Sequence, residues 1–441
     1  MTTAHCTGWV LEPDFFVDEG GAICEGPVTV GGGGPTVRLP GRMLLPGFVN
    51  AHSHSFQRAL RGRVEQRSLH APEDSFWSWR DAMYRDASRL TLDDIEALAT
   101  WAYLDMLRAG FVAVGEFHYL HHDVAGRPCG IESSMRIARA AEKTGIRATL
   151  LQTAYARAGY DLPARPEQAR FVFAAVDDFR AHAQAAARIP HARLKHGLAI
   201  HSVRACPRAW IEAVADMAKD GRPLHVHAAE QRAEIAQCQV EHGMGPIALL
   251  AAAGALRPNT TLVHATHIGA HDVALIAAAG SAVCICPSTE RNLGDGLCPT
   301  EELARAGVSL CVGSDQHARI DPVDELRSLE DHERLRTERR CVLIAPGGRL
   351  GPTLIPYGTR AGRRALDLPP GDWIAVRTPP EGRAGDPAFA VDAFLIGGSG
   401  ADVTDVFIDG ERVVQDGRPT RLDAEAVEAA AIDVLKRLVS E

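Results

Sequence analysis

Histidines and one aspartate occupy positions in this sequence where they could bind a metal ion together. Each follows a short apolar run that is typical of a buried strand. Residues two apart on a strand face the same way, so both side chains of an HxH pair point into one site. A single pair also arises by chance and is weak evidence alone. The candidates are His52 and His54, His225 and His227, His264 and His267, and Asp315.

Three imidazoles and one carboxylate form a suitable ligand set for zinc, with water completing the shell. Such a set requires four separate strand ends to meet at one place. The carboxyl ends of the strands in a closed barrel meet in this way. The combination therefore indicates a metal site, although spacing alone leaves open which histidines bind.

Eight strand-like runs alternate with helix-like runs along most of the chain. The strand candidates are residues 44–53, 111–117, 148–155, 196–202, 223–227, 261–267, 282–286 and 309–314. The helix candidates are residues 91–109 (with Thr91 as N-cap and Gly110 as the stop), 131–144, 166–188, 207–219, 245–253, 272–279 and 301–306. Eight β/α alternations predict a closed (β/α)8 barrel. An open doubly wound sheet is the alternative, but its usual GxGxxG fingerprint is absent.

Both ends of the chain are rich in strand and turn signals. Residues 1–44 are predicted to form short strands and turns, and residues 373–377 and 391–396 to form strands. The dipeptide Asp409-Gly410 between two apolar runs predicts a hairpin, and a helix is expected over residues 424–439. We therefore predict a small β-rich satellite domain of residues 1–44 and 366–441 beside a barrel of residues 45–365.

Composition argues against several functional classes. The 441 residues carry a formal net charge of −9 and no basic run, so we expect no nucleic-acid partner. The apolar runs are far shorter than the about 20 residues of a membrane helix. Ten scattered cysteines without a CxxC pair, and no recognisable signal peptide, favour the cytoplasm. Cys284 and Cys286 are expected to be small buried core residues.

Residues 46–54, PGFVNAHSH, match the strand-one motif of the amidohydrolase superfamily. The chain resembles the single-metal branch of that superfamily over essentially its whole length. The resemblance implies a barrel with one zinc ion per chain, a homodimer, and no second metal at the histidines of residues 118–122. The implied zinc ligands are His52, His54, His227 and Asp315.

The resemblance also implies the catalytic groups. Glu230, three residues after His227, would move a proton from the attacking water to the leaving nitrogen. His264, which matches the family motif better than His267, would polarise a C=N group or stabilise the tetrahedral intermediate. A bound cation lowers the pKa of water toward about 7, and Asp315 would accept a hydrogen bond from that water.

Further segments resemble one branch of the superfamily, the deiminases that release ammonia from the linear amidine N-formimino-L-glutamate in histidine degradation. These segments are longer and less common than the metal motifs, so they discriminate better. They are residues 56–62 (FQRALRG), 76–80 (FWSWR), 116–122 (EFHYLHH), 201–204 (HSVR) and 288–296 (STERNLGDG).

Two arginines fit the two carboxylates of such a substrate. Arg204 lies at the expected end of the fourth strand, and Arg80 lies in the long loop after the first. A guanidinium group can bind a carboxylate through two parallel hydrogen bonds, which lysine cannot do. The resemblance implies that Gln57, Arg80, Tyr119 and Arg204 bind the substrate carboxylates and that His201 supports the reacting end.

Two features depart from this branch. Gln316 and His317 follow Asp315 where Ser-His is expected, and the approach to the last strands lacks a Gly-Lys-x-Ala-Asp motif. The alternatives are a deaminase of guanine, another purine or a pterin, which would leave both arginines unexplained, and imidazolonepropionase, which opens a ring without releasing ammonia. A non-catalytic amidohydrolase scaffold would instead have lost metal ligands.

Overall fold

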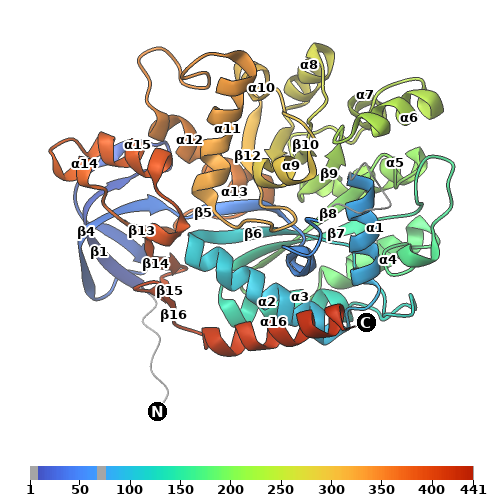
Figure 1. The fold of residues 1–441 in the computed structure, drawn as a ribbon, viewed down its shortest axis with the longest axis horizontal. Helices are drawn as coiled ribbons and strands as arrows, with labels where there is room; N and C mark the ends of the chain where they lie inside the picture. Colours follow the sequence, from blue (N-terminus) through green and yellow to red (C-terminus); the bar gives the residue numbers. More distant parts are fainter. Residues whose placement is uncertain (1–7, 67–75, 441) are drawn as a thin grey trace.

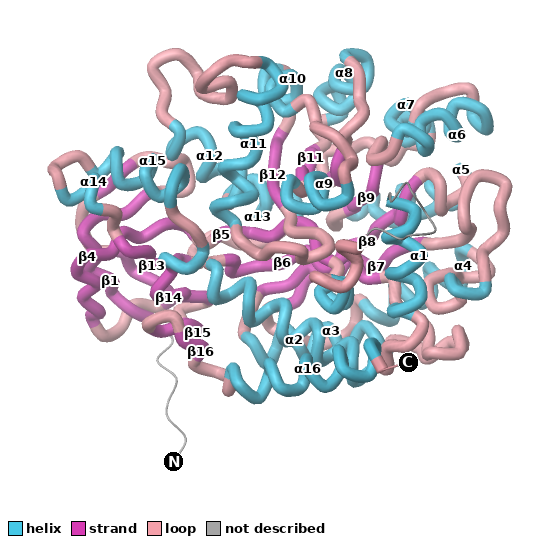
Figure 2. The backbone as a smooth tube through the Cα atoms, viewed as in Figure 1, coloured by secondary structure: helices cyan, strands magenta, loops and turns pink. Residues whose placement is uncertain are grey.

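A sheet of eight parallel strands forms the centre of the computed structural model, which describes residues 8–66 and 76–440. Each strand pairs with the next one along the chain. Figure 1 shows helices around this sheet, and Figure 2 shows a second sheet beside it. The strands are β5 (Phe48–Ser53), β6 (Phe111–His118), β7 (Arg147–Ala154), β8 (Leu194–Ser202), β9 (Leu224–Ala228), β10 (Thr260–His264), β11 (Ala282–Ile285) and β12 (Ser309–Val312).

The first and last strands of this sheet meet. Ser53 at the end of β5 forms a parallel bridge with Asp315, just beyond β12. His54 N donates to Asp315 O at 3.1 Å, and Asp315 N donates to His52 O at 3.0 Å. The sheet therefore closes into the predicted (β/α)8 barrel, and all eight expected strands are present.

Helices cover the outside of the barrel (Figure 1). The helix expected over residues 91–109 is α2 (Leu92–Ala109), where Thr91 and Asp94 form a capping box and Gly110 ends the helix at a φ of 96°. Glycine adopts this left-handed value without strain. The other helices of this region are α1 (Phe76–Ala87), α3 (Glu132–Thr144), α4 (Val176–Ala186), α5 (Arg208–Met217), α6 (Arg232–His242), α7 (Pro246–Ala252), α8 (Ala270–Ala279), α9 (Pro287–Leu293), α10 (Thr300–Arg305), α11 (Pro322–Thr337), α12 (Leu350–Gly358) and α13 (Arg360–Leu366).

Both ends of the chain build the second sheet, as predicted. The N-terminal strand β4 pairs antiparallel with the C-terminal strand β13, with Leu45 opposite Ile374. The expected hairpin joins β14 to β15 through Asp409 and Gly410, whose φ values are 51° and 74°. The strands are β1 (Gly8–Val17), β2 (Ile23–Cys24), β3 (Val28–Gly31), β4 (Thr36–Pro46), β13 (Trp373–Arg377), β14 (Val403–Ile408), β15 (Glu411–Gln415) and β16 (Arg418–Pro419).

The predicted strand at residues 391–396 is wrong, because this segment belongs to helix α15 (Pro387–Gly397). A short apolar run without alternation fits a buried strand and a buried helix equally well. The helix start signals decide the outcome, since the Asp386 side chain accepts from Ala388 N and Pro387 occupies the first turn. The short helix α14 (Pro380–Arg383) precedes it, and the expected C-terminal helix is α16 (Ala424–Val439), which packs along α2.

Two other predicted elements have different limits. Residues 44–46 belong to β4 of the satellite sheet, and the barrel strand begins only after Gly47, where an added Cβ would lie 2.3 Å from Val112 Cγ1. The predicted helix over residues 166–188 is interrupted between the 3-10 turn η2 (Pro166–Gln168) and α4. There the buried Arg170 side chain donates to backbone carbonyls of Leu90 and His122, a tertiary contact that local periodicity does not predict.

The segment after the first barrel strand, predicted as a long loop, contains the 3-10 helix η1 (Ser55–Leu60) and helix α1. Arg80 therefore lies on a helix. Two further 3-10 turns are η3 (Ala218–Asp220) and η4 (Gly400–Asp402). Within residues 8–66 and 76–440, none of the helices is long and apolar enough to span a lipid bilayer.

Candidate active site

The predicted zinc ligands meet at the mouth of the barrel. His52 Nε2 lies 3.1 Å from His54 Nε2 and 3.0 Å from His227 Nε2. Asp315 Oδ1 lies 3.3 Å from the Nε2 atoms of both His52 and His54. Ligand atoms bound tetrahedrally to zinc at about 2.1 Å would lie about 3.4 Å from one another. The four residues thus form a group with the spacing and chemistry for one ion.

Backbone carbonyl groups orient two of these imidazoles. His54 Nδ1 lies 2.9 Å from Phe117 O, and His227 Nδ1 lies 2.8 Å from His201 O. A carbonyl oxygen can only accept, so Nδ1 carries the proton and Nε2 offers its lone pair to the group. Burial lowers the pKa of His52 to about 3 and also lowers the pKa of His54. At neutral pH the imidazoles are therefore in the neutral form that binds metals.

Asp315 connects the predicted metal ligands to the predicted catalytic groups. Its Oδ1 faces His52 and His54, whereas its Oδ2 lies 3.7 Å from His264 Nε2. Although burial opposes the charge, the three imidazoles hold the pKa of Asp315 below its ordinary value. Asp315 and His264 have φ values of 49° and 72°. Such strained conformations persist only where the surrounding structure imposes them, and they are common at active sites.

His264 lies between two carboxylates. Its Nε2 is 3.8 Å from Glu230 Oε1, and its Nδ1 is 3.3 Å from Glu290 Oε1. Burial opposes protonation, but Glu230, Glu290 and Asp315 together raise the pKa of His264 to about 10. Burial also raises the pKa of Glu230. A cationic imidazole beside a carboxyl group with raised proton affinity is suited to general acid–base chemistry.

Glu290 contacts the candidate site through His264, and the sequence prediction did not identify it. It lies in the segment 288–296, but nothing in that segment indicates its contact with His264. Cys286 N donates to Glu290 Oε1 at 2.9 Å, which fixes the carboxylate at the start of α9. The pairing appears only when β10 and β11 lie side by side.

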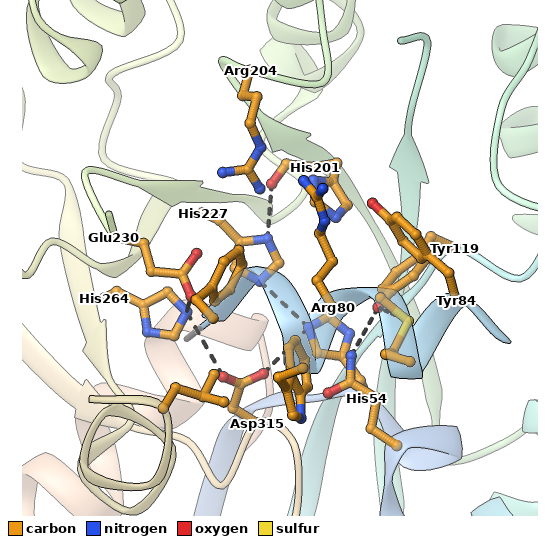
Figure 3. Close-up of a pocket in the computed structure, with 15 residues that line it drawn as sticks. His54, Arg80, Tyr84, Tyr119, His201, Arg204, His227, Glu230, His264 and Asp315 are labelled. Carbon is orange, nitrogen blue, oxygen red and sulfur yellow. Dashed lines mark hydrogen bonds and ion pairs between the residues drawn. The ribbon is translucent and has the colours of Figure 1, made fainter. Parts of the chain in front are cut away.

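The five predicted substrate residues line one pocket together with Glu230, His264 and Asp315, and Figure 3 shows the labelled side chains converging there. Gln57 Nε2 donates to the Tyr119 hydroxyl at 2.8 Å, while Gln57 Oε1 has no hydrogen-bond partner among the described residues. Burial lowers the pKa of His201 well below its ordinary value. The lining also includes residues to which the sequence prediction gave no individual role: Phe76, Trp79, Met83, Tyr84 and Leu293.

Both pocket arginines lie against aromatic rings. The Arg80 guanidinium carbon is 4.6 Å from the centre of the Trp77 ring and 5.5 Å from that of Tyr84. The Arg204 guanidinium carbon is 5.6 Å from Trp77 and 5.9 Å from Phe76. Arg80 Nε and Arg204 Nη1 have no hydrogen-bond partner in the part of the chain that the structure describes. Both groups keep capacity to bind a ligand.

Gln316, the departure next to Asp315, contacts helix α9. Its Nε2 donates to Asn292 Oδ1 at 2.6 Å. His317 lies 3.0 Å from Ser53 Oγ through Nε2 and 2.9 Å from Ser314 Oγ through Nδ1. Gln316 is thus engaged with a neighbouring helix, and His317 supports the chain on both sides of the metal ligands.

The other histidine and cysteine groups near the site have local partners. The rings of the 118–122 segment make three such contacts: His118 Nε2 with Ser133 Oγ at 3.1 Å, His121 Nε2 with Thr153 O at 2.8 Å, and His122 Nε2 with Val172 O at 2.9 Å. Cys284 and Cys286 are buried, as expected. Cys286 also lies within ligand distance of His264 and Asp315, but burial raises the pKa of its thiol, which disfavours the thiolate that binds metals.

Comparison with known proteins finds one family and a consistent set of relatives. The model of the amidohydrolase family matches residues 43–342. Formimidoylglutamate deiminase of Pseudomonas aeruginosa is 37% identical over 426 residues, which cover 93% of each chain. A 5-methylthioadenosine/S-adenosylhomocysteine deaminase of Desulforudis audaxviator is 28% identical and covers 97% of this chain and 95% of its own.

Solved structures have the same fold. An amidohydrolase from Brucella melitensis superimposes with a TM-score of 0.88 at 32% identity, covering 98% of this chain and 99% of its own. An adenosine deaminase from Xanthomonas campestris with bound zinc has a TM-score of 0.81 at 22% identity, with the same coverage. At that identity the second likeness concerns the fold alone.

Proposed function

The chain belongs to the amidohydrolase family, and from this premise we propose that it is a zinc-dependent deiminase of N-formimino-L-glutamate in histidine degradation. The products would be N-formyl-L-glutamate and ammonia. The coarser assignment, a hydrolase of C–N bonds, follows from the family and from its deiminase relative. The observation that carries the finer proposal is the presence of Arg80 and Arg204 in the pocket that holds the metal ligands.

A substrate with two carboxylates explains both arginines. Arg204 is only 6% exposed, and Arg80 pairs at 3.7 Å with Asp81, whose side chain is 62% exposed. Burial opposes the charge on Arg204, but Glu234 and Glu230 raise its pKa, so it stays a cation. Buried cations are stabilised by close anions, and guanidinium groups match carboxylates bidentately. A purine base has no carboxylate and S-adenosylhomocysteine has only one, so neither would provide an anion for each of the two guanidinium groups.

The donor set fits zinc. His52, His54, His227 and Asp315 would hold the ion with three nitrogens and one oxygen. When bound, zinc supplies the Lewis acidity that makes water nucleophilic at neutral pH. The second oxygen of Asp315, which faces His264, can accept a hydrogen bond from that water.

Glu230 and His264 carry the proton transfers. Water adds to the amidine carbon while the Glu230 carboxylate takes one of its protons and passes it to the imine nitrogen. Glu230 then moves the second proton from the hydroxyl group of the tetrahedral intermediate to the same nitrogen, which leaves as ammonia. His264 Nε2 donates a hydrogen bond to the reacting group and stabilises the tetrahedral intermediate. The C–N bond breaks as the carbon–oxygen double bond of the formyl product forms.

The test is ammonia release from N-formimino-L-glutamate by zinc-loaded protein, with N-formyl-L-glutamate identified as the co-product. Guanine and 5′-methylthioadenosine serve as parallel substrates, because Phe76, Trp79, Tyr84 and Tyr119 give the pocket rings that could stack on a purine. Turnover of formiminoglutamate alone supports the proposal. Turnover of a purine alone, by protein holding one zinc per chain, refutes the substrate and keeps the hydrolase.

A further inference from the structure

Trp77 is the ring shared by the two pocket arginines. Its ring centre lies 4.6 Å from the Arg80 guanidinium carbon and 5.6 Å from that of Arg204. Each guanidinium also contacts a second ring, Tyr84 for Arg80 and Phe76 for Arg204. Phe76 packs edge-on against Trp77 at 5.1 Å. The indole therefore connects two cations that come from different elements, helix α1 and the end of β8.

Two like charges in a buried pocket repel each other, and the protein must hold them apart. The face of an indole carries partial negative charge and attracts a cation more strongly than other aromatic faces do. Two guanidinium groups in contact with one indole are each attracted to it, and its rigid bicycle limits how closely they approach. Trp77 is not among the described residues that line the pocket, whereas Phe76, Trp79 and Arg80 are. Its effect on a ligand must therefore pass through the arginines.

We propose that Trp77 is a positioning residue that sets the spacing of Arg80 and Arg204 and thereby makes the pocket selective for a dicarboxylate. This inference rests on the proposed function, since it assigns both guanidinium groups to substrate carboxylates. The reacting end is held separately, by Glu230, His264 and the metal ligands. Trp77 thus governs the binding of the substrate and leaves the chemical step intact.

The prediction for Trp77→Leu is a split between KM and kcat. We expect KM for N-formimino-L-glutamate to rise about tenfold or more, because two stacking contacts are lost, while kcat stays within about threefold. Zinc content should remain one per chain. Trp77→Phe keeps an aromatic face and should recover most of the affinity, which a role in packing volume alone would not predict.

A binding assay separates recognition from catalysis. Glutarate has two carboxylates and no reactive C=N group, and pentanoate has the same chain with one carboxylate. Calorimetry on the zinc-loaded protein should show that Trp77→Leu weakens glutarate binding about tenfold and pentanoate binding less. Phe389→Leu is the matched control. Phe389 lies on α15, is 53% exposed, and its ring centre is 4.7 Å from the Arg349 guanidinium carbon, a cation–aromatic contact of the same kind. This substitution should change neither the affinity for glutarate nor the affinity for pentanoate.

The possible results distinguish the two proposals. In one outcome, wild-type protein binds glutarate and deiminates formiminoglutamate, and Trp77→Leu changes neither KM nor the affinity for glutarate. This outcome would overturn the role of Trp77 and leave the proposed function standing. A loss confined to kcat, or equal losses in Trp77→Phe and Trp77→Leu, would also overturn it. Zinc-loaded wild-type protein that neither binds glutarate nor releases ammonia would overturn both.

Discussion

His225 and His227 have the same spacing as His52 and His54, yet only His227 joins the predicted metal ligands. His225 Nε2 instead contacts Ala365 O at 3.0 Å. Side chains two residues apart on a regular strand face the same way but lie about 6.6 Å apart along it, in different layers of the barrel. The first strand differs because β5 ends one residue before His54, where the chain turns at a φ of −122° and a ψ of 84°. Both imidazoles therefore reach one point.

Glu230→Gln tests the proton shuttle. Glutamine keeps the shape of the side chain but cannot take a proton from water, so we expect kcat to fall about 1000-fold or more. Zinc content should be unchanged, because Glu230 is not one of the four ligands. Ammonia release and metal analysis on the same preparation measure both quantities. The control is Glu212→Gln, which removes a carboxylate from an exposed ion pair on α5. Activity of Glu230→Gln within tenfold of wild type would show that Glu230 is not the proton shuttle.

Arg204→Ala tests carboxylate recognition. Loss of one fixed cation should lower kcat/KM more than a hundredfold, because about 3 kcal/mol or more of transition-state stabilisation is lost. The metal should be retained. Arg204→Lys should recover only part of this loss, because lysine cannot bind bidentately. Steady-state kinetics measure kcat/KM for both variants. The control is Arg208→Ala, which removes an exposed ion pair with Glu212 and should leave kcat/KM unchanged. Unchanged kinetics in Arg204→Ala would contradict our assignment.

At the scale of elements, the barrel strands were the most predictable. Strands buried on both faces favour apolar runs, and such runs mark most of the eight, although β9 (LHVHA) alternates apolar residues with histidines. Helix α1 was not expected, although Phe76, Met83 and Ala87 recur along it at helical spacing and are buried. The structure places Arg80 on this helix in contact with Tyr84, four residues further along the same helix. A loop would not hold the two side chains in this fixed relation.

Glu325 on α11 should make stability depend on pH. Its carboxylate accepts from Ser288 N at 2.9 Å and from the Ser288 hydroxyl, and burial raises its pKa from the ordinary 4.5 to about 8. Between these values the folded state holds a proton that the unfolded state releases. The free energy of unfolding therefore decreases as pH rises from about 4.5 to about 8, by at most about 1.4 kcal/mol per unit.

Urea unfolding across that pH range, for wild type and Glu325→Gln, measures the effect. The glutamine variant lacks the titrating group, so its stability should decrease less steeply with pH than that of wild type. Equal slopes in the two proteins would show that Glu325 is ionised in the folded state throughout this range. Other buried groups contribute to both slopes, so the difference between the proteins is the relevant quantity.

At the scale of the whole molecule, Arg147 joins the barrel to the satellite sheet. It begins β7, and its Nε and Nη2 donate to the two carboxylate oxygens of Asp372 at 2.5 and 3.0 Å, with Asp409 as a further partner. Asp372 is 1% exposed and directly precedes β13. The contact lies at the amino-terminal end of a barrel strand, the end opposite the active site.

Arg147→Ala should therefore lower stability without changing the chemistry. It leaves the buried Asp372 carboxylate unpaired, which costs about 3–5 kcal/mol. Thermal and urea unfolding measure the loss, and kcat of the folded variant should match wild type. Lys219→Ala removes an exposed pair with Asp216 and should cost less than about 1 kcal/mol. Equal effects of the two substitutions would show that the Arg147 pair contributes no more than a surface contact.

The amino-acid sequence alone was sufficient for the features that depend on neighbouring residues. The eight strands, the capped helix α2, the Asp409-Gly410 hairpin and the residue types of a zinc site follow from periodicity, turn chemistry and ligand preference. Strand periodicity left open whether His225 or His227 faces the ligands, and the family resemblance selected His227. Only the tertiary structure decided that Glu290 pairs with His264 and that Trp77 contacts both arginines. These relations are distances between segments far apart in the chain, and local patterns contain no information about such distances.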